Sequence, residues 1–263
     1  MIPASVDYVR PGSVEEALDA LAQPEAKLLA GGQSLLPAMK LRIARPSLLV
    51  DVGGLDLGGI EERDGELVVG AITTWDALAR ADLRPAFRAL TECAAGIGDL
   101  QVRNLGTIGG SLAHADPASD MPAVTLALGA RLKVRSATGE RTIDASELAL
   151  GPFMTSLGEG ELITEIRIPV PPEGSGSAYV SVEHPASGFA LAGAAAQVYP
   201  DRESRVALTG VVAAPFLLIG DDGADEAEMF GDRFAPIAYR RQLAETVVRR
   251  AIALAEDRAK EDS

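Results

Sequence analysis

The sequence predicts an α+β fold in two domains, and three observations lead to this prediction. Short apolar runs alternate with helix signals over the first two thirds of the chain. A stretch rich in Pro, Gly and Ser, residues 169–177, then interrupts the pattern. Three strand-like runs and a long helix follow it. We therefore expect a first domain over 1–173, with subdomains of about 1–56 and 57–173, and a smaller α+β domain over 174–263 with a three-stranded antiparallel sheet and helices.

The first subdomain is predicted to begin with a β-α-β unit. Residues 13–16, Ser-Val-Glu-Glu, form a capping box that opens a helix. Apolar runs at 27–30 and 47–52 are predicted strands, and Ser34 is expected to cap a helix between them. This order is typical of a parallel unit that binds a ligand at the carboxyl end of a strand. The glycine spacing is not that of a dinucleotide-binding domain of the Rossmann type.

The second subdomain and the last part of the chain are predicted to alternate hairpins with helices. In order we expect a hairpin at Asp64-Gly65, helices from Thr73 or Thr74 and from Pro85, a loop over 96–103, a helix from Met121-Pro122, a hairpin at Thr138-Gly139 and a strand over 162–168. Beyond the interrupting stretch we expect strands over 178–183, 189–199 and 204–213, and a helix over 236–260.

Composition excludes several classes of function. The net charge is −14, which argues against binding the phosphate backbone of a nucleic acid. One cysteine, Cys93, cannot form an intrachain disulfide or hold an iron–sulfur cluster, and two distant histidines disfavour a zinc site. Any redox chemistry would therefore need an organic cofactor. The N-terminus lacks a signal-peptide pattern and no apolar run approaches ~20 residues, so we expect a soluble, cytoplasmic protein without a membrane span.

Two glycine-rich segments carry the main functional signal. The segment over 104–122 contains Gly106, and its Gly109-Gly110 pair lies between two hydroxyl residues, Thr107 and Ser111. A similar segment lies upstream, where Ala30 is followed by Gly31, Gly32, Gln33 and Ser34. Glycine lets backbone approach a ligand closely, and successive N–H groups form an anion site. The pair indicates a diphosphate held between two loops, whereas either one alone is equally consistent with a tight bend between strand and helix.

Four polar residues near these segments have alternative interpretations. His114 is either a proton-transfer group or an ordinary hydrogen-bonded loop residue. Asp116 and Asp120 could serve metal or acid–base chemistry or cap helices, but a carboxylate that accepts hydrogen bonds from a cofactor fits better. Arg103 either offsets diphosphate charge or pairs with Asp99 at the surface.

The order of these motifs resembles a known family. Ala-Gly-Gly-Gln-Ser-Leu at 30–35, Arg-Asn-Leu-Gly-Thr-Ile-Gly-Gly-Ser at 103–111 and Asp-Met-Pro-Ala at 120–123 are similar to the FAD-binding middle subunit of molybdenum hydroxylases. This family includes the flavoprotein subunit of carbon monoxide dehydrogenase and the FAD domain of xanthine dehydrogenase. The resemblance continues through 161–169 and 184–190, and so spans nearly the whole chain.

The resemblance implies a fold and a set of cofactor contacts. The fold would be a two-part FAD-binding domain of the vanillyl-alcohol-oxidase (PCMH) type, followed by a smaller α+β domain. The residues that match FAD-binding positions of the family are Ala30, Gly31, Gly32, Gln33, Ser34, Thr107, Ile108, Gly109, Gly110, Ser111, Asp120, Ile163 and Phe189. Phe189 falls where relatives often place an aromatic residue near the isoalloxazine. The chain departs from the family at Ser181, where many relatives have a lysine that would stabilise reduced flavin.

The resemblance also implies a role in a larger enzyme. The chain would be an electron-transfer subunit with no catalytic residue and no metal of its own. Electrons would reach its FAD from [2Fe–2S] clusters in a small partner subunit, after a large molybdopterin-binding subunit has oxidised the substrate. A dimer of heterotrimers is the expected assembly. Two rival interpretations remain: a self-standing FAD oxidoreductase, and a non-redox nucleotide-binding regulator.

Overall fold

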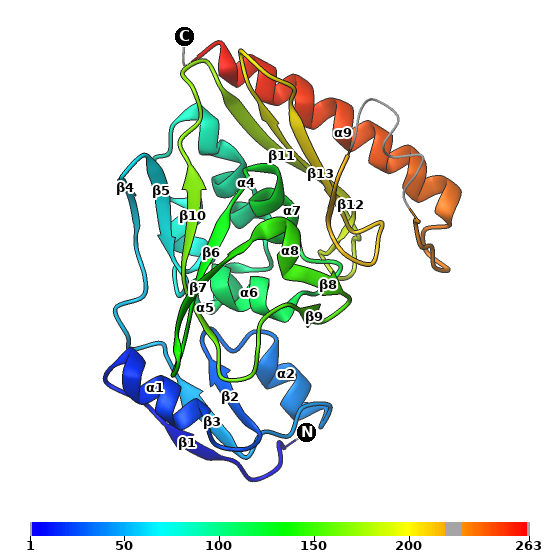
Figure 1. Cartoon of the computed structure of the whole chain (residues 1–263). Coiled ribbons are helices and arrows are strands. Elements are labelled where there is room, and N and C mark those ends of the chain that lie inside the picture. The colour runs from blue at the N-terminus through cyan, green and yellow to red at the C-terminus, as the bar shows by residue number, and fades with distance from the viewer. Residues whose placement is uncertain (1, 219–227, 262–263) are drawn as a thin grey trace.

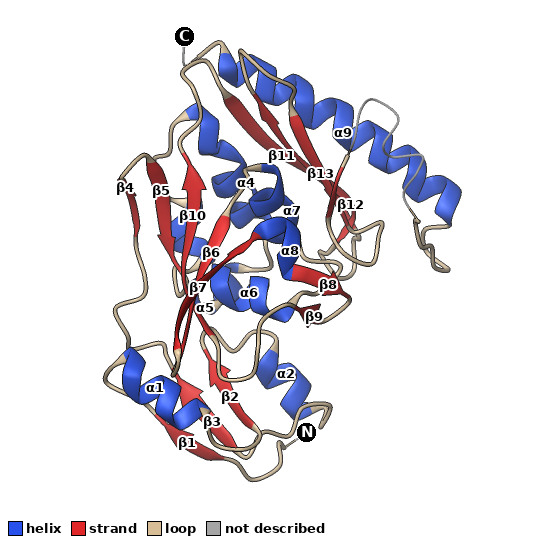
Figure 2. Ribbon diagram, in the orientation of Figure 1, coloured by secondary structure: helices blue, strands red, loops and turns tan. Residues whose placement is uncertain are grey.

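The structure is a computed structural model that describes residues 2–218 and 228–261. Over these residues the strands form four sheets, and Figure 1 shows the three larger ones in succession from one end of the molecule to the other. Figure 2 shows that helices lie against each of these three sheets. The mixed α+β class predicted from the sequence is confirmed.

The N-terminal sheet is parallel, with the strand order β1-β3-β2. Its elements are β1 (Asp7–Val9), α1 (Val14–Leu21), β2 (Ala26–Leu29), α2 (Leu35–Lys40) and β3 (Leu48–Asp51). Ser13 caps α1, as predicted, because its side chain accepts a hydrogen bond from the N–H of Glu16. Ser34 does not cap α2: its backbone is already helical and its side chain makes no capping bond. The predicted parallel unit is therefore present, and β1 joins it as an unpredicted strand.

The central sheet has five strands in the order β4-β5-β10-β6-β7, and all its pairs are antiparallel. Both predicted hairpins belong to it. The strands are β4 (Ile60–Arg63), β5 (Glu66–Gly70), β6 (Arg131–Ser136), β7 (Gly139–Asp144) and β10 (Leu162–Pro169). Buried aliphatic side chains from β5, β6 and β10 line the core beneath the sheet.

Helices fill the long connection between β5 and β6. They are α3 (Trp75–Ala79), a 3₁₀ turn (Pro85–Phe87), α4 (Arg88–Gly96), α5 (Leu100–Leu105), α6 (Ile108–His114) and α7 (Met121–Ala127). The prediction of a loop over 96–103 was wrong, because Asp99 caps α5 by accepting a hydrogen bond from the N–H of Val102. After β7 come α8 (Ala145–Leu148) and the small hairpin of β8 (Ala149–Gly151) and β9 (Met154–Thr155).

The C-terminal sheet is antiparallel and is covered on both faces. Its strands are β11 (Gly176–Glu183), β12 (Ala190–Val198), β13 (Arg205–Thr209) and β14 (Phe216–Leu217). The short β14 makes a fourth strand where three were predicted. Helix α9 (Ile237–Ala259) packs on one face, and α4 and α7 contact the other (Figure 1). The approach of α9 is close, because a Cβ at Gly176 would lie 2.1 Å from the carbonyl oxygen of Ala255.

The hydrophobic core runs between the central and C-terminal sheets. One cluster of buried residues extends from Leu67 on β5 to Ala207 on β13, and includes Tyr179 on β11. A smaller cluster lies between the C-terminal sheet and α9.

We keep the division into domains at residue 173 as a proposal. None of the helices described here is long and apolar enough to cross a membrane.

Candidate functional site

The two glycine-rich segments lie directly against each other. A Cβ placed on Gly31 would lie 1.9 Å from the carbonyl oxygen of Leu105 and 2.8 Å from the Cα of Gly106. A Cβ on Gly110 would lie 3.9 Å from the Cβ of Ala30. More than seventy positions separate the two segments in the chain, and the fold brings them into contact through glycines that leave room for neighbouring backbone.

The first segment presents a run of free backbone donors. Among the residues that the structure describes, none accepts a hydrogen bond from the N–H groups of Gly31, Gly32, Gln33 or Ser34. Gly32 has a φ of 71°, so the chain turns there in a conformation that favours glycine. The Gln33 amide donates to the carbonyl oxygen of Gly31 at 3.1 Å and braces the turn. Gln33 and Ser34 belong to the first turn leading into α2, where the carbonyl oxygen of Gly32 accepts a hydrogen bond from the N–H of Leu36 and the first N–H groups have no partner within the helix. Together with the turn at Gly32, these N–H groups are donors that an anion can use.

The second segment is anchored from the end of β5. The N–H of Ile108 donates to the carbonyl oxygen of Thr73 at 3.1 Å, and that of Gly109 donates to Ala71 at 2.8 Å. Thr107 caps α6 by accepting a hydrogen bond from the N–H of Gly110 at 3.2 Å. The Gly109-Gly110 pair is therefore not the turn that we expected, because it forms the first turn of a helix.

The two glycines of this pair have different surroundings. Gly109 is buried, and a Cβ on it would lie 2.7 Å from the Cβ of Ala71. A glycine at this position therefore allows α6 to pack closely against Ala71. Gly110 is exposed on the side of the first segment. The next residue, Ser111, has its Oγ 2.8 Å from the Oγ of Ser119, which ties α6 to the following loop. A ligand between the segments would meet Gly110 before Gly109 or the fully buried Ile108.

Asp120 forms the most distinctive polar contact near these segments. It stands at the N-cap position of α7 but makes no capping bond with its side chain. Its Oδ1 instead accepts a hydrogen bond from the hydroxyl of Tyr179 on β11. The motifs in the sequence did not identify Tyr179 as a residue of the site, because the residues around it give no sign that it contacts Asp120.

Burial perturbs the titration of this pair. Loss of solvation raises the pKa of Asp120 to about 6, the Tyr179 hydrogen bond lowers that pKa, and the charge of Glu183 raises it. Burial and the neighbouring carboxylate hold the pKa of Tyr179 well above its usual range. Cys93 is buried beside them, and its pKa is raised mainly by burial, so it is an inert thiol.

The structure shows the surroundings of the other polar residues. Arg103 donates to the carbonyl oxygens of Ile97 and Gly98, at 3.3 and 2.7 Å, instead of forming the expected surface pair with Asp99. Asp116 accepts a hydrogen bond from the N–H of Ala118 and closes a local turn. The half-buried ring of His114 packs 5.2 Å from that of Phe153.

The last two predicted positions lie on other elements. Ile163 is buried on β10, beside an irregularity in its pairing with β6. Phe189 lies in the turn between β11 and β12 and is 49% exposed. The turn is closed by a hydrogen bond of 2.8 Å from the N–H of His184 to the carbonyl oxygen of Phe189. An exposed aromatic ring on a short turn is available to a planar ligand. The contacts of Ile163 and Phe189 with a cofactor stay predictions.

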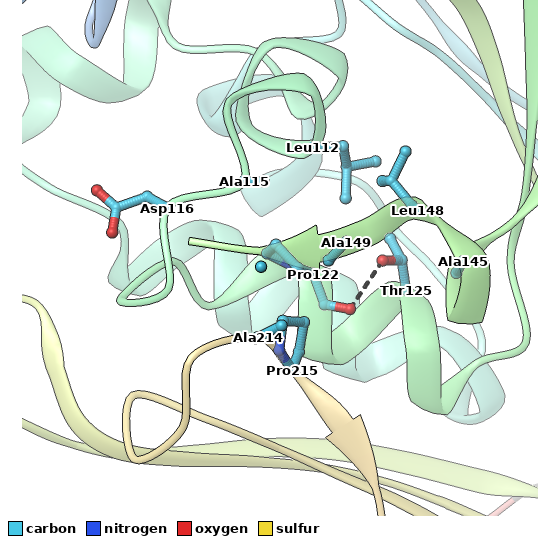
Figure 3. A pocket seen from close by; sticks show the side chains of 11 residues that line it. Leu112, Ala115, Asp116, Pro122, Thr125, Ala145, Leu148, Ala149, Ala214 and Pro215 are labelled. Atoms are coloured by element: carbon cyan, nitrogen blue, oxygen red, sulfur yellow. Dashed lines mark hydrogen bonds between the residues drawn. The ribbon is translucent and has the colours of Figure 1, made fainter. Parts of the chain in front are cut away.

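A small pocket lies elsewhere, between α6, α7, α8 and the segment that leads into β14 (Figure 3). Its lining is mostly aliphatic, and the one hydrogen bond drawn there joins the hydroxyl of Thr125 to the carbonyl oxygen of Pro122 at 3.0 Å. The carboxylate of Asp116 points away from the other side chains in this view. None of the residues at 30–34 lines the pocket, so we assign it no part in holding a diphosphate.

These observations fit the cofactor that the resemblance implies. A diphosphate needs several donors close together, and four consecutive N–H groups without an acceptor begin at Gly31, the residue that lies against the second segment. Gly31 brings the segments together, because a side chain there would collide with the backbone of Leu105 and Gly106. Asp120 adds a hydrogen-bond acceptor of the kind that a ribose or amide group requires. We therefore treat the residues of the two segments, with Asp120, as able to hold FAD.

Comparisons with known proteins agree with FAD as the cofactor of this chain. Residues 4–171 match the model of the family described as the FAD-binding domain in molybdopterin dehydrogenase. The chain is 37% identical to the carbon monoxide dehydrogenase medium chain of Afipia carboxidovorans, over 99% of this chain and 100% of that protein. It is 43% identical to subunit alpha of the 6-hydroxypseudooxynicotine dehydrogenase complex of Paenarthrobacter nicotinovorans, over 78% and 71%. A chain of carbon monoxide dehydrogenase from Hydrogenophaga pseudoflava superimposes with a TM-score of 0.91 and 36% identity, covering 98% and 99%.

Proposed function

Because this chain belongs to the family of FAD-binding domains of molybdopterin dehydrogenases, we propose that it is the FAD-carrying electron-transfer subunit of a molybdenum hydroxylase. The observation that carries the proposal is the contact between the two glycine segments. Gly31 lies against the backbone of Leu105 and Gly106, and the N–H groups of residues 31–34, a run that begins at this contact, have no acceptor among the described residues.

The residues of this chain would bind and orient the cofactor. The N–H groups of the first segment would donate to diphosphate oxygens, joined by groups exposed on the second segment, such as Gly110. Asp120 would accept a hydrogen bond from FAD. Ile163 would pack beside the cofactor, and Phe189 would lie near the flavin ring system. Bound FAD supplies the ability to take electrons singly from an iron–sulfur cluster and to release them to an external acceptor.

The remaining machinery would belong to other subunits. Relatives include a medium chain of carbon monoxide dehydrogenase and a subunit of a dehydrogenase complex, and both names denote multi-subunit enzymes. We propose a large molybdopterin-binding partner and a small partner with [2Fe–2S] clusters, assembled as a dimer of heterotrimers in the cytoplasm. The substrate pocket would lie in the large partner.

A single purification tests this proposal. The chain should be expressed with its neighbouring genes, captured by a tag on this chain, and analysed for flavin, iron and molybdenum in one sample. We expect about one FAD per chain, together with iron and molybdenum in co-purifying subunits. A sample with flavin but no metal-containing partner would support a self-standing oxidoreductase, and a sample without flavin would support a non-redox regulator. Either result would contradict the proposal.

A further inference from the structure

Tyr179 links two elements that are distant in the chain. It lies on β11, is only 8% exposed, and its hydroxyl donates a hydrogen bond to Oδ1 of Asp120 at the start of α7. The opposing strand makes room for it, because a Cβ on Gly193 would lie 2.3 Å from the hydroxyl oxygen. The ring therefore occupies a place shaped for it, with its polar end directed at the carboxylate.

The backbone of Tyr179 is also hydrogen-bonded. Its N–H donates to Oε2 of Glu92 on α4 at 2.9 Å. Glu92 is paired in turn with Arg258 on α9, which also donates to the carbonyl oxygen of Ser177 at 2.6 Å. Helices α4 and α9 thus hold this part of β11, and the hydrogen bond from Tyr179 connects Asp120 to this network.

Asp120 has little else to orient it. Its side chain makes no capping bond to α7, and among the residues described here Oδ2 accepts no hydrogen bond. Oδ2 is not completely enclosed, so its capacity to accept a hydrogen bond is left for a group other than the donors of this chain. A carboxylate held through one oxygen and open at the other is arranged to accept a hydrogen bond in a defined direction.

We propose that Tyr179 is a positioning residue for the cofactor: its hydroxyl holds Oδ1 of Asp120 so that Oδ2 accepts a hydrogen bond from FAD. This inference rests on the proposed function, since it needs FAD to be the ligand. It adds a residue that acts through Asp120 and touches no part of the cofactor itself. The bond also keeps the carboxylate ionised, because a donor to the charged form favours that form.

The charged and titratable groups around Asp120 define its pH dependence. They are Tyr179 on β11, which lowers the pKa of Asp120, and Glu183 at the end of β11, which raises it; Cys93 on α4 is buried nearby. Protonation of Asp120 near pH 6 removes the charged acceptor, so FAD affinity should fall as the pH drops below that value. Loss of the tyrosine hydroxyl should move this fall to higher pH.

The test is a fluorescence titration of FAD into the full-length protein from pH 5 to pH 8. We expect Tyr179→Phe to bind FAD about tenfold more weakly at pH 7.5, because a hydrogen bond to a charged group is lost. Its affinity should also begin to fall at a pH about one unit higher than in the wild type. Tyr199→Phe, a half-buried tyrosine just after β12 that makes no contact with Asp120, is the matched control and should behave as wild type.

A double-mutant cycle separates positioning from packing. If Tyr179 acts through Asp120, the Tyr179→Phe change should have almost no further effect on FAD affinity in an Asp120→Ala background. If Tyr179→Phe weakens FAD binding equally in the wild-type and Asp120→Ala backgrounds, and the pH midpoint of binding does not shift, Tyr179 has only a packing role. This result would overturn the inference and leave the proposed function intact. A Tyr179→Phe protein that binds like the wild type would also overturn it. Failure of the wild type to bind FAD would overturn the proposed function as well.

Discussion

The hydroxyl of Tyr179 donates a hydrogen bond to the carboxylate of Asp120, although 59 positions separate the two residues in the chain. The bond joins the C-terminal sheet to the helix that follows the second glycine segment. Removing the donor would leave a largely buried carboxylate with no protein partner, which is costly in a medium of low polarity. The C-terminal sheet therefore contributes directly to the candidate FAD site.

The contact between the glycine segments yields the first prediction. Gly31→Ala should force the segments apart, because the new Cβ would lie 1.9 Å from the carbonyl oxygen of Leu105. We expect a destabilisation of about 1–3 kcal/mol and at least tenfold weaker FAD binding. Flavin per chain and the thermal midpoint measure both effects. Gly12→Ala is the control, since its nearest neighbour is a flexible Glu16 oxygen at 3.5 Å. Normal flavin content in Gly31→Ala would show that the contact does not hold the cofactor.

A second prediction concerns stability and pH. The pKa of Asp120 is raised to about 6, so between about pH 4 and pH 6 the native state binds more protons than the unfolded state. The free energy of unfolding should therefore fall as the pH rises through this range and stay lower above it. Above pH 6 the native state therefore carries the cost of a buried, ionised Asp120. Asp120→Asn removes this cost and should raise the free energy of unfolding of the FAD-free chain by up to about 3 kcal/mol at pH 7.5, and by about half as much at pH 5.

Denaturant unfolding at the two pH values measures this effect. Asp116→Asn, four positions upstream, is the matched control because an asparagine can still accept the hydrogen bond from the N–H of Ala118. The increase in the free energy of unfolding should appear in Asp120→Asn and not in the control, and Asp120→Asn should bind FAD more weakly. A gain that grows toward pH 5 would have the wrong sign and would contradict the account.

A third prediction concerns the flavin potential. Ser181 follows Tyr179 by two positions on β11, so both side chains lie on the same face of the strand. Ser181→Lys would place a cation on that face and should raise the flavin potential, because a positive charge stabilises anionic reduced flavin. A shift of roughly 30 mV would correspond to about 1.4 kcal/mol for a two-electron couple. Ser181→Gln, long but uncharged, is the control in a redox titration, and equal potentials in both variants would refute the placement.

A fourth prediction concerns the link between α9 and the site. Arg258 pairs with Glu92, which also accepts the N–H of Tyr179. Arg258→Met would leave a partly buried carboxylate without its cation, at a cost of about 3 kcal/mol, or a fall of the thermal midpoint by roughly 6–12 °C. Arg249→Met, on an exposed position of the same helix, should change the midpoint little. Equal midpoints for the two variants would show that the pair does not hold β11 in place.

Local signals in the sequence were sufficient for much of the fold. Ser13 caps a helix as predicted, and Thr74, one of the two candidates named, caps another. Asp64-Gly65 forms the turn of a hairpin as predicted, whereas the second hairpin turns one residue before the predicted Thr138-Gly139, because Gly139 already pairs with Ser136. These features depend on a few neighbouring residues. The strand at 7–9 was missed because all its side chains are exposed and only pairing with β3 defines it. Helix α5 was missed because the glycines of 96–98 outweighed the capping signal of Asp99.

The candidate site, too, could be predicted from local sequence signals only in part. Sequence order alone indicated two glycine segments, but Gly109 and Gly110 belong to a helix whose position depends on Ala71 and Thr73 of a distant segment. The partnership of Asp120 with a tyrosine arises from packing of α7 against the C-terminal sheet and has no local signature. Contacts of this kind follow from tertiary structure.

The central claim is that both glycine segments hold one FAD molecule. Hydrogen exchange of the full-length protein with and without FAD measures this most directly, because the N–H groups of residues 31–34 have no acceptor among the described residues. We predict that exchange slows on addition of FAD in both peptides, the one that covers 31–34 and the one that covers 107–111. Protection that appears in only one of these peptides, or only around the apolar pocket at 145–151, would contradict the account.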